Sequence, residues 1–194
     1  FEVNGEGLLL TTASCLLNPN RNPGWARTAV EETLRNMLGV RQIVWLEGEL
    51  AGDDTDGHVD NLARFVDANT VVVAAEDDPD DANYATLQAN LATLRSMRTP
   101  PGAPLEVVEL PMPSAPVEVD GVRLPASYAN FYIANRVVLV PLYDDPNDVR
   151  ALDVLRACFP DRRVVGLEAT AVLCGLGAFH CLTQQVPAPR AAGA

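Results

Sequence analysis

The chain has 194 residues, 48% of them hydrophobic and 21% charged, which is enough to bury one sizeable core and does not require two domains. Its formal net charge of −12 argues against a nucleic-acid partner or an anionic membrane surface, because binding phosphate groups requires a basic surface. The sequence has no run of about 18 apolar residues, no signal-like segment and no CxxC pair among its four cysteines, so we expect a cytoplasmic protein.

The N-terminal part predicts two strands, a helix and a third strand. Apolar runs at residues 1–3 and 8–12 flank the turn-forming sequence NGEG, which is typical of a hairpin. Residues 26–38 carry apolar side chains at helical spacing, and Gly39 stands where a glycine commonly ends a helix. Residues 41–46 then have the composition of a buried strand, which completes a ββαβ unit.

The same order recurs twice further along the chain. The expected elements are strands 61–66 and 70–75, helix 81–97, strand 105–109, strands 128–133 and 137–141, helix 147–158, strand 163–167 and a last strand 179–184. A ββαβ unit that returns about every 60 residues indicates an internal repeat. This pattern alone fits both a closed α/β propeller and an open α+β sheet, because each buries one face of a sheet beneath a helix.

The connecting segments indicate a single domain. Two proline-rich stretches, residues 99–104 and 111–116, are predicted to be connections, since strand-like sequence follows each of them. Residues 1–187 are expected to form the domain, and residues 188–194 a disordered tail rich in alanine and proline. The acidic run at 77–81 is interpreted as a solvated helix start rather than a cation site, because aspartate there accepts from free N–H groups.

Residues 52–61, GDDTDGHVDN, contain the first of two histidines. Acidic side chains and glycines make a poor helix and a poor strand, so we expect a loop that leads into the following strand. If the backbone is extended, His58 and Asp60 point to the same face, because side chains alternate along a strand. A base and a carboxylate would then share one wall of a site.

The second histidine lies in residues 175–185, GLGAFHCLTQQ. Strand alternation predicts that His180 and Cys181 face opposite sides, so we assign no role to His180. A cysteine needs a nearby base or cation to act as a nucleophile at neutral pH, and His58 is the candidate partner for Cys181. An acidic cleft beside a thiol would suit a cationic electrophile.

Two other interpretations of these residues compete with cysteine chemistry. Free cysteine packs as a small hydrophobe, so a buried core thiol is the simplest interpretation of the remaining cysteines. These are Cys15, Cys158 and Cys174, which we expect to lie away from any site. A mixed zinc site of His58, Asp54, Asp60 and Cys181 is disfavoured, because zinc sites usually take two ligands from one short motif, and no metal is predicted.

Four segments, in order along the chain, resemble the agmatine deiminase family, a Porphyromonas-type peptidyl-arginine deiminase-like family of the guanidine-modifying pentein superfamily. They are residues 10–12 with 15–23 (LTT and CLLNPNRNP), 52–61 (GDDTDGHVDN), 124–132 (LPASYANFY) and 180–185 (HCLTQQ). The resemblance covers residues 1–187 and corresponds to the C-terminal part of the family. It implies an α/β propeller, the pentein fold, with about three of its five ββαβ units present.

The resemblance also implies an activity and roles for individual residues. Cys181 would attack the guanidinium carbon of agmatine and form an amidino-cysteine intermediate, while His58 carries protons to ammonia and from water. Asp60 would bind the guanidinium group, and Asp54 would shape the pocket or receive the distal amine. The product would be N-carbamoylputrescine, on a route of polyamine metabolism that leads to putrescine. No cofactor is implied, and a homo-oligomer stays open.

Two departures from the family pattern qualify this interpretation. The family carries an Arg-Asp-x-Gly-Pro and a Leu-Glu-Gly-Gly motif, which we expect to lie before Phe1, so the chain is expected to be N-terminally incomplete and inactive alone. Residues 175–177 are Gly-Leu-Gly, so Leu176 stands where the family pattern has a third glycine in a Gly-Gly-Gly run. The alternatives are a peptidyl-arginine or free-arginine deiminase, or a catalytically silent fragment that keeps the fold.

Overall fold

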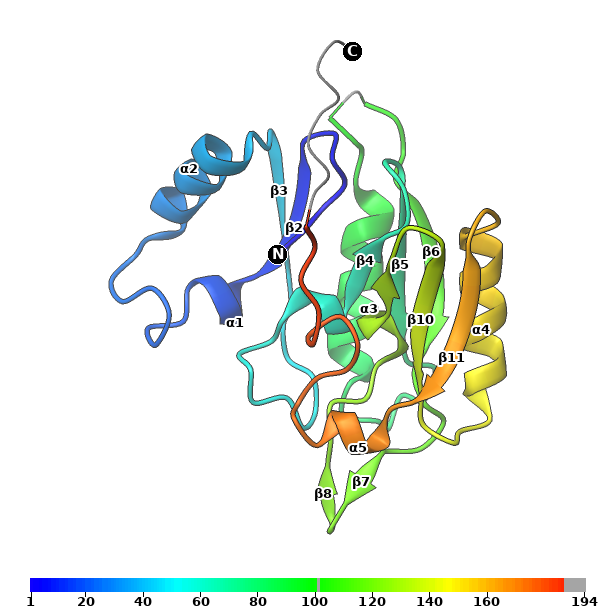
Figure 1. The fold of residues 1–194 in the computed structure, drawn as a ribbon. Coiled ribbons are helices and arrows are strands. Elements are labelled where there is room, and N and C mark those ends of the chain that lie inside the picture. Colours follow the sequence, from blue (N-terminus) through cyan, green and yellow to red (C-terminus); the bar gives the residue numbers. More distant parts are fainter. Residues whose placement is uncertain (101, 187–194) are drawn as a thin grey trace.

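Three short mixed sheets form the framework of the computed structural model, which describes residues 1–100 and 102–186 (Figure 1). In each sheet the first two strands are antiparallel and the last two are parallel, with a helix in the connection between the parallel pair. The ββαβ order predicted from the sequence is therefore confirmed in all three units. The predicted tail, residues 188–194, lies outside the described residues, as does residue 187 of the predicted domain.

The first unit contains β1 (Glu2–Val3), β2 (Leu8–Thr12), α1 (Ala13–Leu16), α2 (Arg27–Leu38) and β3 (Gln42–Leu46). The second contains the 3-10 turn η1 (Val59–Asn61), β4 (Ala63–Phe65), β5 (Thr70–Ala75), α3 (Tyr84–Ser96) and β6 (Glu106–Pro111). The hairpin β7 (Glu118–Val119) and β8 (Val122–Arg123) precedes the third unit. That unit contains η2 (Tyr128–Asn130), β9 (Tyr132–Ile133), β10 (Val137–Leu142), α4 (Asn147–Cys158) and β11 (Arg163–Glu168), and α5 (Thr170–Leu173) follows it.

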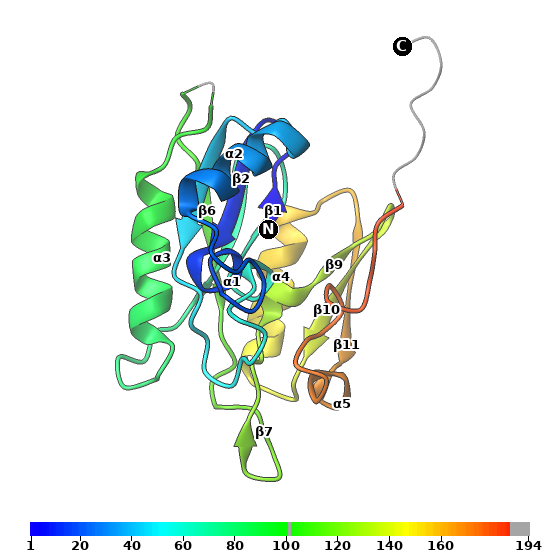
Figure 2. The ribbon, with the colours of Figure 1, turned by 90° about the vertical axis from the view of Figure 1, so that its left-hand side faces the viewer.

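The core lies where the sheets meet the helices. Every side chain of β5 is buried, as expected for a central strand covered on both faces. Helix α4 contacts both β6 and β11, and it therefore joins the second and third units. Figure 2 shows α3 at one side of the molecule and the β9–β10–β11 sheet at the other, with α4 between them. This packing places the polar turns η1 and η2 next to each other.

The end of helix α2 lies where the sequence predicted it, whereas the start of helix α3 does not. Gly39 has φ 68°, a left-handed conformation that glycine adopts easily, and its N–H donates to the carbonyl of Arg35 at the end of α2. Helix α3 begins at Tyr84 rather than 81, so the acidic run precedes the helix instead of filling its first turn. Asp81 in that run forms an ion pair of 2.9 Å with Arg123.

Two predicted strands begin later than expected because their first residues form 3-10 turns. The predicted strand 61–66 is reduced to β4, and the predicted strand 128–133 is reduced to β9. Ser127 caps the second turn by accepting from the N–H of Ala129 at 3.2 Å, and its hydroxyl donates to the carbonyl of Asn61 at 2.7 Å. These side-chain bonds compete with the extended backbone and turn Asn61 and Asn130 inward.

The predicted last strand, 179–184, is wrong. Residues in this segment form turns, in which the N–H of Leu182 donates to the carbonyl of Ala178 and that of Thr183 to the carbonyl of His180. No strand pairs with this segment among the described residues, because the backbone N–H groups of His180 and Cys181 donate to Oδ1 of Asn130 while those of Leu182 and Thr183 close the turns. The segment is therefore a loop laid across η2.

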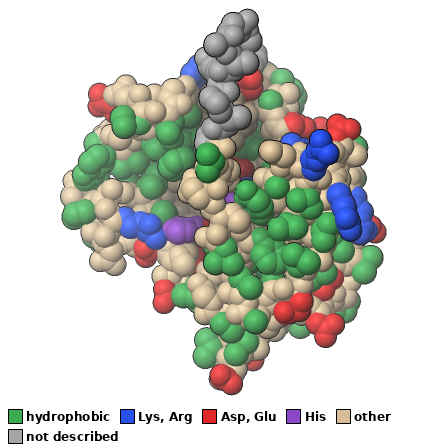
Figure 3. Space-filling view, viewed as in Figure 1, with side chains coloured by type: hydrophobic (Ala, Val, Ile, Leu, Met, Phe, Trp, Pro, Cys, Tyr) green, Lys and Arg blue, Asp and Glu red, His purple; other side chains and the backbone are tan. Residues whose placement is uncertain are grey.

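The surface carries both charged and apolar regions. Figure 3 shows hydrophobic side chains spread over the face formed by β9, β10, β11 and the segment after α5. Leu167 and Leu182 are two of the exposed large hydrophobic residues there. Within residues 1–100 and 102–186, no helix is long and apolar enough to cross a membrane.

Candidate active site

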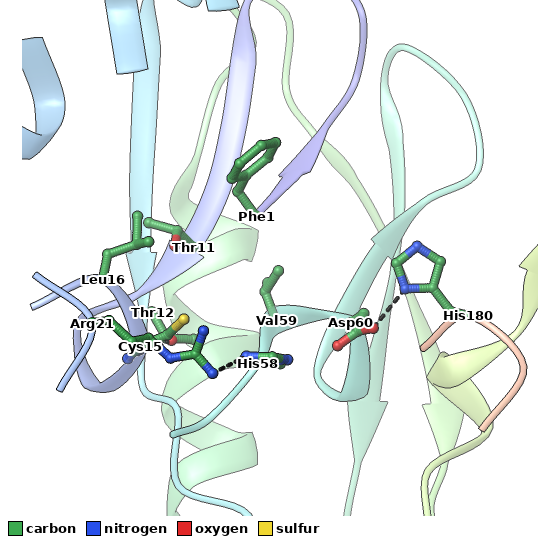
Figure 4. A pocket seen from close by; sticks show the side chains of 10 residues that line it. All are labelled: Phe1, Thr11, Thr12, Cys15, Leu16, Arg21, His58, Val59, Asp60 and His180. Carbon is green, nitrogen blue, oxygen red and sulfur yellow. Dashed lines mark hydrogen bonds and ion pairs between the residues drawn. The ribbon is translucent and has the colours of Figure 1, made fainter. Parts of the chain in front are cut away.

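A pocket of about 360 Å³ opens between the first two units and the loop after α5 (Figure 4). It is lined by Phe1, Thr11, Thr12, Cys15, Leu16, Arg21, His58, Val59, Asp60 and His180. Strand β2 and the segment after α1 form one side, and the polar turn η1 forms the other. Both histidines of the sequence therefore line one pocket, although the sequence analysis assigned no role to His180.

His58 lies at the start of η1, where the backbone is extended, and is held from the first unit. Its Nε2 lies 2.9 Å from Nη2 of Arg21, and Arg21 pairs through Nε with Asp56 at 3.0 Å. Because a guanidinium only donates, Nε2 of His58 is the acceptor and the imidazole is neutral in this arrangement. The adjacent Gly57 carbonyl accepts from the hydroxyl of Thr12 at 2.5 Å, which fixes the loop against β2.

Asp60 is 8% exposed and points away from His58, toward the loop after α5 (Figure 4). Its Oδ2 lies 2.5 Å from Nδ1 of His180 and accepts from the thiol of Cys181 at 3.3 Å. Burial would raise the pKa of Asp60, but the hydrogen bond and charge of His180 outweigh it and lower the pKa to about 2. The other oxygen, Oδ1, is buried with no hydrogen-bond partner among the described residues.

Cys181 is accessible, and its sulfur lies between Asp60 and the amide of Asn130, whose Nδ2 donates to it at 3.1 Å. Desolvation by the surrounding protein and the negative charge of Asp60 raise the pKa of the thiol to about 11. A side chain at Gly177 would place its Cβ 2.6 Å from the Cβ of Cys181 and 2.7 Å from its sulfur. Glycine is therefore required at that position for the thiol to reach Asp60.

The structure brings some predicted site residues together and separates others. Asp60 contacts Cys181, and His58 and Asp60 line the same pocket, but Cys181 is not among the lining residues. The predicted common orientation of His58 and Asp60 is wrong, because residues 59–61 form a 3-10 turn and Asp60 points away from His58 (Figure 4). Asp54 is exposed and does not line the pocket. The chemical roles assigned to the four residues stay predictions; these residues are Cys181, His58, Asp60 and Asp54.

The expectations for the remaining cysteines hold only in part. Cys15 was expected to lie away from the site, but it is buried and lines the pocket. Cys174 was expected to be buried, and it is exposed. Burial raises the pKa of the thiols of Cys15 and Cys158.

Sequence analysis missed two residues that touch Asp60 or Cys181. His180 was assigned to the opposite face because a strand was expected, whereas the turn lets consecutive side chains converge on Asp60. Asn130 was noted as part of a motif but was given no function. The pattern offered no signal for its contact with Cys181, which is 51 residues away in sequence.

Within residues 1–100 and 102–186, no group of three or more histidine, cysteine, aspartate or glutamate side chains is arranged to hold a metal ion. The site instead places Asp60 and two imidazoles on the wall of a small cavity, and the exposed Cys181, which does not line the cavity itself, contacts Asp60 from the adjoining loop. Such an arrangement can hold a cation against Asp60 and present its electrophilic atom to sulfur.

Comparison with known proteins identifies close relatives. Residues 1–187 match the family model described as Porphyromonas-type peptidyl-arginine deiminase. The agmatine deiminase of Pseudomonas aeruginosa (strain LESB58) is 42% identical over an alignment of 209 positions, which covers 99% of this chain and 57% of that protein. This chain therefore spans little more than half the length of that curated relative.

Solved structures give the same result. A substrate-bound cysteine-to-serine variant of the C. jejuni agmatine deiminase matches with a TM-score of 0.86 and 38% identity, over 92% of this chain and 52% of that one. A Porphyromonas gingivalis structure, named for a proposed arginine deiminase activity, matches with a TM-score of 0.92 and 49% identity. That match covers 96% of this chain and 55% of the other.

Proposed function

The chain belongs to the Porphyromonas-type peptidyl-arginine deiminase family, and we propose that it carries the nucleophile of an enzyme that hydrolyses agmatine to N-carbamoylputrescine and ammonia. The observation that carries the proposal is the contact between the accessible thiol of Cys181 and the buried carboxylate of Asp60, beside a pocket with two histidines. The three ββαβ units would be three of the five in a propeller of the pentein type. Neither a cofactor nor a metal is part of the proposal.

Asp60 would hold the guanidinium group. Its charge is retained at neutral pH, since its pKa is lowered to about 2, and Oδ1 is a buried acceptor without a partner among the described residues. A guanidinium N–H that donates to Oδ1 would satisfy this orphan oxygen with a charge-assisted hydrogen bond. The same contact would bring the planar guanidinium carbon toward the sulfur of Cys181.

The bound cation would also help to ionise the nucleophile. The thiol, with its pKa raised to about 11, is protonated at neutral pH, partly because the Asp60 carboxylate disfavours a second negative charge. A guanidinium between them offsets that charge and lowers the thiol pKa. The substrate itself would therefore convert Cys181 to the reactive thiolate.

The reaction then has two balanced steps. The thiolate forms a C–S bond with the guanidinium carbon, and one terminal nitrogen takes a proton and leaves as ammonia, which yields an amidino-cysteine. Water next adds to the same carbon, the C–S bond breaks and the sulfur recovers a proton. One agmatine and one water thus give one N-carbamoylputrescine and one ammonia.

We assign the proton transfers to His58, which must exchange its Arg21 partner for the substrate to perform them. His180 is the competing candidate, because its imidazole contacts Asp60 directly. A role for Asp54 in receiving the distal amine stays a prediction, which a selective rise in KM in an Asp54→Asn variant would support. A cytoplasmic location is likewise a prediction.

A chimera tests the proposal, with this chain in place of the matching segment of the Pseudomonas aeruginosa agmatine deiminase. Ammonia and N-carbamoylputrescine are assayed with agmatine, arginine and an arginine-containing peptide as competing substrates, and with the 194-residue chain alone alongside. Cys181→Ser should bind agmatine but lose nearly all turnover, because a hydroxyl is a far weaker nucleophile than a thiolate. The exposed thiol of Cys174 supplies the matched control, Cys174→Ser, which should keep full turnover.

The outcomes separate the alternatives. Preference for arginine or the peptide would assign the chain to a different substrate within the same family. A folded chimera that releases no ammonia, while the parent enzyme does, would support a silent fragment and contradict the proposal. Loss of turnover in His180→Ala but not in His58→Ala would move the proton transfers to His180.

A further inference from the structure

Asn130 is fully buried and connects the nucleophile loop to the rest of the site through both atoms of its carboxamide. Its Oδ1 accepts from the backbone N–H groups of Ala178 at 3.1 Å, His180 at 3.1 Å and Cys181 at 3.3 Å. Its Nδ2 donates to Oδ1 of Asn61 at 2.8 Å and to the sulfur of Cys181 at 3.1 Å. Every hydrogen-bonding atom of the amide is therefore in use.

The orientation of this amide is determined by its partners. The three backbone N–H groups can only donate, so the atom that faces them is the oxygen. The nitrogen must then face Asn61 and Cys181. As a consequence, the sulfur accepts from an N–H group of Asn130 and donates to the Asp60 carboxylate.

We propose that Asn130 is a positioning residue for Cys181, which holds the nucleophile loop through its oxygen and stabilises the thiolate through its nitrogen. The proposal rests on the proposed function only in taking Cys181 as the nucleophile. A donor to sulfur favours the charged form of the thiol, whereas Asp60 favours the neutral form. The N–H group of Asn130 thus partly offsets the effect of Asp60 on the thiol, while the Asp60 carboxylate remains available to bind the substrate.

Asp60 is the titratable side chain in contact with this sulfur; His180 contacts Asp60, and Tyr143 is close enough for its pKa to respond to the charge of Cys181. The pKa of Tyr143 is raised by burial, so its hydroxyl stays neutral across the range of a thiol titration. Asp60 is ionised throughout that range, because its pKa is lowered to about 2. A change in the ionisation of Cys181 on a substitution of Asn130 that adds no charge therefore reports on the amide.

The test separates the two functions of the amide with two substitutions. Asn130→Asp keeps an oxygen for the three backbone N–H groups, but it replaces the donor to sulfur by an ionised carboxylate, whose charge itself disfavours the thiolate. Asn130→Leu removes both the oxygen and the donor without adding a charge, so the loss of the donor should slow alkylation of Cys181 in Asn130→Leu as well. Asn90 offers the matched control, because it is a buried amide that bridges the N–H and carbonyl of Glu47, and Asn90→Asp makes the same change at an amide whose hydrogen bonds go to Glu47 and not to a cysteine.

The measurement is the rate of iodoacetamide alkylation at each cysteine as a function of pH, resolved by mass spectrometry in the 194-residue chain. Because only the thiolate reacts, each pKa unit slows alkylation about tenfold at pH values below the pKa. Asn130→Asp should slow Cys181 by at least about tenfold near pH 9 while exposed Cys174 is unchanged, and Asn90→Asp should leave both at the wild-type rate. Hydrogen exchange at residues 178–181 should stay slow in Asn130→Asp and become fast in Asn130→Leu.

A Cys181 rate in folded Asn130→Asp that is equal to wild type would overturn the thiolate role, whether or not any deiminase activity exists. Alkylation of buried Cys15 would reveal a variant that has unfolded. For that case a second measurement uses the native amide: the side-chain N–H signals of Asn130 should shift in Cys181→Ala, while those of Asn90 do not. Signals of Asn130 that ignore the loss of the sulfur would refute the proposal.

Discussion

Replacement of Gly177 by alanine is the smallest change that should displace the nucleophile. The glycine precedes Cys181 by one turn of the loop, and the new Cβ would lie 2.6 Å from the Cβ and 2.7 Å from the sulfur of that residue. Carbon atoms at optimal separation are about 3.5–4.0 Å apart, so either the thiol or the loop backbone must move by roughly 1 Å. The movement breaks the contacts of the sulfur with Asp60 and Asn130.

The cost can be worked from this geometry. Overpacking of a closely packed position costs about 1–3 kcal/mol. For a domain of this size, each kcal/mol lowers Tm by roughly 2–4 °C, so Gly177→Ala should lower Tm by about 2–12 °C. A misplacement of about 1 Å at a reacting atom can reduce turnover by about 10²-fold, which corresponds to about 2.7 kcal/mol and is comparable with the upper end of the loss of stability.

Gly175 in the same run is the control, because a Cβ there would meet only the carbonyl of Val172, at 3.3 Å. Gly175→Ala should change Tm by a few degrees at most and leave turnover within about threefold of wild type. Thermal unfolding of the 194-residue chain and steady-state kinetics of the chimera provide the two measurements. Wild-type turnover in a folded Gly177→Ala variant would refute the requirement for close contact between this backbone and the thiol.

Three further predictions concern the loop, the carboxylate and metal dependence. Leu176 has φ 65°, a conformation that costs a non-glycine residue about 1–2 kcal/mol. Leu176→Gly removes this cost, but glycine loses more backbone entropy on folding, so the substitution should raise the free energy of unfolding by up to about 1 kcal/mol, as measured in urea. A clear loss of stability would contradict this. Asp60 has its pKa lowered from 3.8 to about 2, so it contributes roughly 2 kcal/mol of stability above pH 3.8, which is lost as the pH falls through about 2. The stability difference between wild type and Asp60→Asn should therefore shrink in urea titrations from pH 6 to about pH 2, and a constant difference would show that the carboxylate charge is not responsible. Dialysis of the chimera against EDTA should leave turnover unchanged, whereas inhibition reversed by zinc would restore the mixed zinc site as an interpretation.

The sequence alone determined the three ββαβ units. Their apolar residues repeat with the period of each element, and local signals such as Gly39 mark where a helix ends, so these features depend on residues close together in the chain. The residues that carry the family resemblance, among them Cys181 and His58, were also identified in this way. Local pattern also suggested that His58 and Asp60 face one wall, but Asp60 points away from His58 because the segment forms a 3-10 turn (Figure 4).

The prediction of a strand at residues 179–184 was wrong because this segment depends on residues far away in the chain. Its sequence alternates well enough for a strand, but its backbone N–H groups bond to Asn130, about 50 residues earlier in the chain. The turns η1 and η2 were missed in the same way, because Ser127 and Asn130 bond across to Asn61 and not to near neighbours. The spacing of hydrophobic residues along the sequence cannot by itself reveal a backbone that is held by a distant side chain.

Tertiary structure alone decided what surrounds the nucleophile. Alternation along a strand separated His180 from Cys181, but the turn brings both to Asp60, so one carboxylate meets an imidazole and a thiol. His58, two residues away, is instead held by Arg21 from the first unit. Side-chain direction depends on the backbone path, and here contacts between units set that path. The sequence therefore named Cys181 and Asp60 but not their partners His180 and Asn130.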